Sequence, residues 1–435
     1  MNRPRLSLLL FVILNLTLPL SVMGETYEAP PILSAKDRLP AKYFQDPRFQ
    51  IEAQVPTDGF LAEYTINSDF GSFTAKGPGR IAVIINEIIA LAKLEELENS
   101  DEFSAGAKDA ADETADSIKT WIDKPAETAK GIPEGVGRFF KRTYRAAKTG
   151  VQSLGDVKKG YKPGSTQATG SDADALELSS LALKRIGQVT ADAFGYDEAR
   201  RKLAKHLEVD PYTTNPVLTQ KLDEIAWASF SGSLGINVAV SLIPGGVLLK
   251  RSHMVTDWVW DMSPGDLRVK NDEALNNIGV AQAEIDRFLR HHLFTTTLQT
   301  AMVKGLEDLK DVTGRKAVIP WALEAENLDE ARFIVWALRM LAQYHKNQQP
   351  LAKIEIFTTV AGRTLQDQMV VMAPVDYLSW SQRLHQYIMQ PEFQGVQCSL
   401  WLTGDISDRA HKELSALGWD VHIKTLFKRI KNPLE

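Results

Sequence analysis

The sequence predicts an α+β multidomain protein, predominantly α-helical, with a small N-terminal β-plus-helix unit, a central helical domain and a small C-terminal α/β domain. Three observations predict this architecture. The chain has 435 residues, more than a single hydrophobic core usually supports. Apolar residues recur at helical spacing through residues 173–346, and a strand–helix–strand pattern lies within residues 350–426. The composition is globular, and the net charge of −5 provides no general attraction to nucleic acid.

Residues 1–24 have the layout of a secretory signal peptide. Basic residues in "MNRPR" precede the apolar run "LSLLLFVILNLTLPLSV", and small residues follow, which predicts cleavage between Gly24 and Glu25. A retained membrane anchor is the alternative, because the apolar run is nearly long enough to span a bilayer. The single Cys398 excludes an intramolecular disulfide. Export without disulfides indicates a bacterial envelope, so we expect a periplasmic, membrane-associated or secreted protein.

Residues 25–98 predict the β-plus-helix unit. The segment "FQIEAQV" at 49–55 alternates as a half-buried strand does, and "FLAEYTIN" and "GSFTAK" indicate two further short strands. A helix follows from Arg80 to Glu98, because isoleucines and leucines recur there at helical spacing. The expected role of this unit is structural.

Residues 99–172 contain fewer large apolar side chains and end in the linker-like "YKPGSTQATGSD". From 134 to 162 there are eight basic and two acidic residues, with Phe139, Phe140 and Arg142 in the centre. This basic amphipathic pattern is typical of a segment that lies on an anionic membrane surface. The alternative is a solvated helix or a linker without a fixed structure.

The helical domain, residues 173–346, contains recognisable helix starts. Thr214 or Asn215 is predicted to cap a helix opened by Pro216, and Ser263-Pro264 marks another start. The later segments "AQAEIDRFLRHHLF", "TTTLQTAMVKGLEDL" and "LDEARFIVWALRMLAQYH" are each amphipathic.

Residues 227–249 carry no charge. Ala228, Gly232, Gly235 and Ala239 recur at spacings of four, three and four, which predicts one helical face that another helix can approach closely. A proline and two glycines at 244–246 then interrupt the helix, which predicts an apolar hairpin. Only 13 of these 23 residues are Leu, Ile, Val, Ala, Phe or Trp, so independent membrane insertion is marginal. A buried hairpin of a helical domain and a membrane-inserting hairpin both remain open.

Residues 350–426 predict the α/β domain. The strands "AKIEIFTTV" and "TLQDQMVVMAPV" are expected to form a hairpin that turns at "AGR", and "SWSQRLHQYIM" is expected to be helical. The strand "CSLWLTG", the helix "ISDRAHKELSALG" and the strand "WDVHIKTL" then predict a parallel βαβ unit, with Gly418 ending the helix.

Two carboxylates are the weak candidates for catalysis. Asp405 follows one predicted strand and Asp376 follows another, and ligands bind at such strand ends in open α/β sheets. The alternative is structural, because Asp405 or Ser407 can also cap the helix that follows. The histidines lack metal-ligand spacing and no nucleophile motif occurs, so the sequence predicts no metal and no cofactor.

These patterns favour an exported envelope protein that binds or scaffolds and associates peripherally with the membrane. Its expected partner is a membrane surface or an envelope protein, and not nucleic acid. Two alternatives remain: a periplasmic hydrolase-like enzyme with its site around Asp376 and Asp405, and a secreted membrane-active effector that inserts the apolar hairpin.

Overall fold

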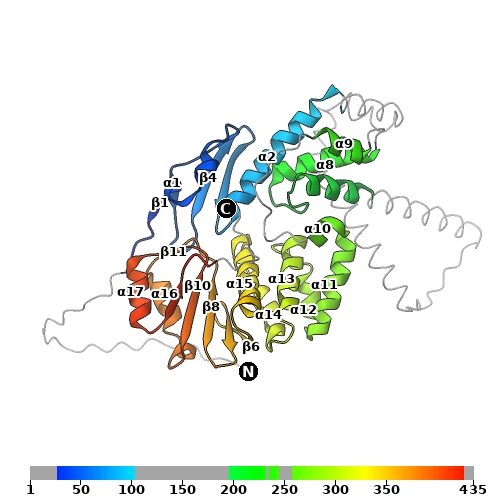
Figure 1. The fold of residues 1–435 in the computed structure, drawn as a ribbon. Coiled ribbons are helices and arrows are strands. Elements are labelled where there is room, and N and C mark those ends of the chain that lie inside the picture. Colours follow the sequence, from blue (N-terminus) through cyan, green and yellow to red (C-terminus); the bar gives the residue numbers. More distant parts are fainter. Residues whose placement is uncertain (1–26, 102, 104–194, 232–234, 244–256, 426–435) are drawn as a thin grey trace, which may run out of the picture.

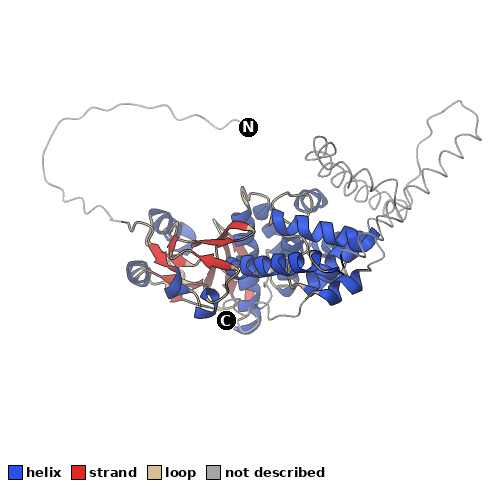
Figure 2. Cartoon of the chain, turned by 90° about the horizontal axis from the view of Figure 1, so that it is seen from above, coloured by secondary structure: helices blue, strands red, loops and turns tan. Residues whose placement is uncertain are grey.

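The computed structural model describes residues 27–101, 103, 195–231, 235–243 and 257–425 of the chain. Within these ranges the protein is a mixed α+β structure, as the sequence predicts (Figure 1). Strands and a few helices gather on one side of the molecule, and the other side is helical (Figure 2).

The N-terminal part contains two small antiparallel sheets and a few short helical turns. Strands β2, β4 and β5 form one sheet, and β1 and β3 form the other. The bounds of these elements are β1 (Ile32–Ser34), α1 (Ala35–Arg38), η1 (Ala41–Phe44), β2 (Phe49–Ile51), β3 (Gln54–Pro56), β4 (Glu63–Ser68) and β5 (Gly71–Lys76). The single strand predicted at 49–55 is therefore wrong, because β2 pairs with β4 while β3 turns away to pair with β1. The two strands predicted next correspond to β4 and β5.

The predicted helix at 80–98 is confirmed as α2 (Arg80–Glu98). Its first half, up to Ile89, packs into the core of the N-terminal sheets. Its second half, from Ala90 to Leu97, packs into a core formed with helices after residue 195. One helix therefore joins two cores, which explains why its apolar residues lie on almost every side.

Helices make up the central part of the structure. A helix covers residues 195–206. The others are α8 (Pro216–Ser231), α9 (Ile236–Leu242), α10 (Asp257–Asp261), α11 (Pro264–Ile278), α12 (Gln282–Phe288), α13 (Thr296–Asp308), η2 (Arg315–Ala317), α14 (Val318–Ala322) and α15 (Leu328–Asn347). Two predicted caps are confirmed. The Ser263 hydroxyl accepts the amide N–H of Asp266, and Asn215 Oδ1 accepts the amide N–H of Val217 at 3.1 Å.

The single helical face predicted through residues 228–239 is wrong. Helix α8 ends at Ser231, and Gly235 precedes α9 in an extended conformation with φ −59° and ψ 149°. Ala239 is fully buried, but Gly235 is exposed and a Cβ built there would meet no atom within 4 Å. Close helix packing at Gly235 is therefore not observed, and Gly232 lies outside the described residues. In the described part of the chain, no helix is both long and apolar enough to cross a membrane.

The C-terminal part contains a five-stranded mixed sheet in the order β12-β10-β8-β7-β6. Its elements are β6 (Leu351–Ile356), β7 (Val360–Thr364), β8 (Met369–Ala373), α16 (Gln382–Ile388), η3 (Pro391–Phe393), β10 (Cys398–Leu402), α17 (Asp408–Ala416) and β12 (Asp420–His422). The predicted parallel βαβ unit is confirmed, since β10 and β12 pair in parallel and α17 connects them. Two short strands, β9 (Tyr377–Leu378) and β11 (Asp405–Ile406), form a separate parallel pair.

Both faces of the five-stranded sheet are covered. Val370 and Met372 of β8 face the core that contains α15, whereas Met369 and Val371 face the core that contains α16 and α17. A two-sided sheet of this kind has nearly continuous apolar strands, and all of "MVVM" is buried here.

The hairpin turn predicted at "AGR" is wrong, because these residues lie inside strand β7. The chain turns instead between β6 and β7, at residues 357–359. A Cβ on Gly362 would lie 2.8 Å from side-chain atoms of Leu341 and Leu351. This glycine allows α15 to pack closely on the sheet. In the sequence alone, a glycine needed for close packing cannot be told from a glycine that marks a turn.

Candidate functional site

The structure brings the two predicted carboxylates, Asp376 and Asp405, into neighbouring strands. Asp376 directly precedes β9 and Asp405 begins β11, and the amide of Asp405 donates to the carbonyl of Asp376 at 3.1 Å. The intervening Gly404 permits this approach, because a Cβ there would lie 2.0 Å from the Asp376 carbonyl oxygen.

Both carboxylates already have protein partners. Asp405 forms ion pairs with Arg38 of α1 and, at 2.9 Å, with Lys424. The Oδ2 atom of Asp376 accepts the amide N–H of Ala62 at 2.9 Å. Neither residue lines the pocket described below. The two side chains therefore attach the N-terminal part of the chain to the C-terminal sheet.

Burial strongly raises the pKa of Asp376, to about 7, although the Ala62 amide and the Arg38 charge both act to lower it.

The predicted cap in this region is Ser407, whose hydroxyl accepts the amide N–H of Ala410 at 3.0 Å at the start of α17. Asp405 is not the cap.

The other predicted residues lie elsewhere. Phe139, Phe140 and Arg142 fall outside the described residues, so their membrane role remains a prediction. Cys398 is buried, and burial raises the pKa of its thiol to about 11, which disfavours the reactive thiolate. Among the described residues, no group of three His, Cys, Asp or Glu side chains is placed to hold a metal ion.

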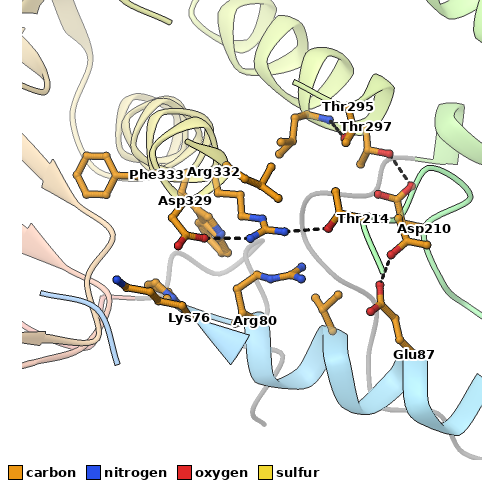
Figure 3. Close-up of a pocket in the computed structure, with 18 of the residues that line it drawn as sticks. Lys76, Arg80, Glu87, Asp210, Thr214, Thr295, Thr297, Asp329, Arg332 and Phe333 are labelled. Atoms are coloured by element: carbon orange, nitrogen blue, oxygen red, sulfur yellow. Dashed lines mark hydrogen bonds and ion pairs between the residues drawn. The ribbon is translucent and has the colours of Figure 1, made fainter. Parts of the chain in front are cut away.

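A pocket that the sequence did not predict lies where the N-terminal, helical and C-terminal parts meet. Its cavity volume is about 90 Å³, and the space around it reaches about 1060 Å³ only when the open solvent at its mouth is included. Side chains reach it from the β5–α2 turn, the first two turns of α2, the loop at 208–214, the start of α13 and the start of α15 (Figure 3). We call it the junction pocket.

Three cations line one end of the junction pocket: Lys76, Arg80 and Arg332. Lys76 pairs with Asp58 at 3.1 Å, and Arg332 donates to Asp329 at 3.0 Å and to the Thr214 hydroxyl at 3.1 Å. The guanidinium of Arg80 has no hydrogen-bond or ion-pair partner among the described residues.

Burial, followed by the positive charge of Arg80, lowers the pKa of Arg332 to about 10, which leaves Arg332 protonated at neutral pH. Figure 3 shows the two guanidinium groups on the same side of the pocket. Two like charges in one partly buried site favour an anion between them.

Carboxylates line the other end. Glu87, only 2% exposed, accepts a hydrogen bond from the hydroxyl of Thr213 and, at 3.1 Å, one from the side-chain amide Nδ2 of Asn215. Asp210 Oδ1 accepts the Thr297 hydroxyl at 2.6 Å and the Tyr212 amide at 2.8 Å. Burial raises the pKa of Asp210 to about 6. The pocket therefore has a cationic end and an acidic end.

The starts of four helices surround the junction pocket. Gly79 precedes α2, Thr214 lies two residues before α8, Thr295 precedes α13 and Asp329 lies in the first turn of α15. Helix N-termini carry partial positive charge. Four of them therefore increase the positive potential that the cations create in the pocket, and they also stabilise the buried carboxylates. Thr295 and Asn327 cap α13 and α15 with side-chain oxygens, whereas Gly79 has no side chain to offer α2.

Sequence reasoning missed this pocket, although two weak signals point to it. Glu87 interrupts the apolar run of α2, and a buried acid within such a run needs a specific partner. The "GPGR" at residues 77–80 lies between a strand and a helix, and Gly77 and Gly79 both have positive φ, 90° and 72°. Neither signal identifies Asp210 or Arg332, which are far away in the sequence.

No family model, curated protein or solved structure matches this chain. The argument for function therefore rests on the site itself.

Proposed function

We propose that this protein is an exported binding protein of the bacterial envelope that holds a small polar ligand in the junction pocket. The observation that carries the proposal is the pocket itself, a cavity at the meeting point of three parts of the chain. On its wall lies Arg80, whose guanidinium has no partner within the described part of the chain. Such interdomain cavities, with a few converging polar groups, are the usual place for small-molecule binding.

We propose that the chain is organised as a β-plus-helix unit (25–98), a helical domain (173–346) and an α/β domain (350–426). Shared apolar cores connect these units: α15 shares one core with strands of the C-terminal sheet, and the second half of α2 shares another with helices after residue 195. A ligand in the junction pocket would contact all three units and stabilise their arrangement.

The binding proposal has more support than the hydrolase alternative. A general acid or base needs a carboxylate that faces substrate, but Asp376 and Asp405 are both occupied by protein donors. The effector alternative depends on residues 227–249, part of which lie outside the described residues.

The first test is to fill the pocket. We expect Thr214→Trp to abolish ligand-induced stabilisation, because residue 214 is exposed, lines the pocket, and the larger indole would occupy its mouth. The measurement is a thermal-shift screen of small charged and neutral solutes on the wild type and the variant. A solute at 100 times its Kd stabilises the wild type by about 2.7 kcal/mol. Equal shifts in both proteins would place the binding elsewhere and contradict the proposal.

We further propose that residues 1–24 direct export and that the basic segment 134–162 holds the protein peripherally on an anionic membrane or an envelope partner. Cell fractionation tests this. We expect a membrane-bound pool that a high-salt or carbonate wash releases, because screening weakens attraction to anionic lipids. A protein found only in the soluble fraction at both low and high salt would contradict the membrane association, and a purely cytoplasmic pool would contradict export.

A further inference from the structure

The junction pocket has unmet hydrogen-bonding capacity at both of its ends. At the cationic end, the Arg80 guanidinium has no partner among the described residues, and its positive charge acts on a second arginine on the same side of the pocket, Arg332 (Figure 3). A guanidinium carries five N–H donors in a planar fork that matches the oxygens of a carboxylate or phosphate. An anionic oxygen group between the two arginines would satisfy both.

At the acidic end, the two oxygens of Asp210 differ. Oδ1 accepts both hydrogen bonds, from Thr297 and from the Tyr212 amide, whereas Oδ2 accepts none from the described part of the chain. Asp210 is half-buried and lines the pocket, so Oδ2 remains available there. A carboxylate oxygen is an acceptor only, which calls for an ammonium or hydroxyl group on the ligand.

The acidic end is not an anion site, and this restricts the ligand class. Glu87 and Asp210 line it, so a purely anionic ligand would meet repulsion there. A purely cationic ligand would be repelled by Arg80 and Arg332 at the other end of the pocket. Only a ligand with an anionic group at one end and a cationic or hydrogen-bond-donating group at the other fits both ends of the pocket.

We propose that the junction pocket binds a small bipolar ligand, with an anionic oxygen group between Arg80 and Arg332 and an ammonium or hydroxyl group on Asp210. This inference rests on the proposed binding function and specifies its ligand. The anionic group is a carboxylate or a phosphate, and the experiment separates the two.

The experiment is isothermal titration calorimetry of the full-length protein with two bipolar probes and their fragments. Phosphoethanolamine carries a phosphate and an ammonium, and β-alanine carries a carboxylate and an ammonium. Inorganic phosphate, propionate and ethanolamine each supply one end. We expect one bipolar probe to bind at least about tenfold more tightly than either of its fragments, because a charged hydrogen bond is lost with each missing end.

Two variants test which group of the ligand binds at each end of the pocket. Arg80→Gln should weaken the bipolar probe about tenfold or more and leave the ethanolamine fragment unchanged. Asp210→Asn should weaken the bipolar probe similarly and leave inorganic phosphate or propionate unchanged. Arg80→Gln is expected to fold, since Arg80 has no side-chain partner to lose in the described structure. Asp210→Asn retains the oxygen that accepts the Tyr212 amide, and circular dichroism checks its fold.

The matched control is Lys202→Gln, which removes one positive charge from an exposed i,i+4 pair with Glu198 outside the pocket. It should bind every probe as the wild type does. Unchanged probe affinity in Arg80→Gln and Asp210→Asn would overturn the bipolar assignment, as would the absence of any probe binding. The proposed binding function would then still be decided by the Thr214→Trp screen, so failure of the two proposals can be distinguished.

Discussion

Gly404→Ala is expected to destabilise the protein by about 3 kcal/mol or more, because overlap with a rigid backbone atom cannot be relieved by side-chain movement. The new Cβ would lie 2.0 Å from the carbonyl oxygen of Asp376. The β9–β11 pair must then separate, which weakens the hydrogen bond from the Asp405 amide to Asp376 and the hydrogen bond from the Lys424 amide to the Gly404 carbonyl.

The measurement is the midpoint of urea unfolding for the variant and the wild type. Gly235→Ala is the matched control, because residue 235 is exposed, has a φ of −59°, and leaves a Cβ free of contacts within 4 Å. We expect it to change the free energy of unfolding by less than about 1 kcal/mol. A Gly404→Ala protein as stable as this control would refute the close approach of β9 and β11.

Asp376→Asn is expected to make the protein more stable than the wild type at pH 8, with a smaller advantage at pH 5. Folding raises the pKa of Asp376 from 3.8 to about 7, mainly through burial. The folded chain therefore holds this proton more tightly than the unfolded chain. The free energy of unfolding contributed by Asp376 is complete below pH 3.8 and falls as the pH rises towards 7. The asparagine has no proton to lose and can still accept the Ala62 amide.

The difference in the free energy of unfolding between variant and wild type should therefore grow by about 2 kcal/mol from pH 5 to pH 8. Urea unfolding at several pH values measures it. Asp210, whose pKa is also raised, is present in both proteins and cancels in the comparison. Asp69→Asn, which removes a solvent-exposed carboxylate, is the control. If the difference between variant and wild type is independent of pH, Asp376 is not a buried carboxylate.

Local signals in the sequence located several elements accurately. The bounds of α2, the caps Asn215 and Ser263 and the βαβ unit of β10, α17 and β12 are all observed as predicted. These features depend on residues within a few positions of one another, since a cap or a helical repeat is set by neighbouring side chains.

Predictions that required knowledge of distant partners were wrong. Gly362 was interpreted as part of a turn, but it lies in strand β7, where Leu341 and Leu351 occupy the space that a Cβ would need. Gly235 was placed on a packing face, but α8 and α9 are separate helices and this glycine is exposed. A glycine in a sequence does not reveal which requirement it meets.

The sequence by itself determined the mixed α+β class, the positions of many helices and strands, and the positions of Asp376 and Asp405 after two strands. Only the tertiary structure showed that those carboxylates are occupied, and that Arg80, Asp210 and Arg332 meet in one pocket. The physical reason is that a charged residue at the start of a helix has the same local sequence whether it faces water or another helix. Its function depends on which charges the fold places opposite it.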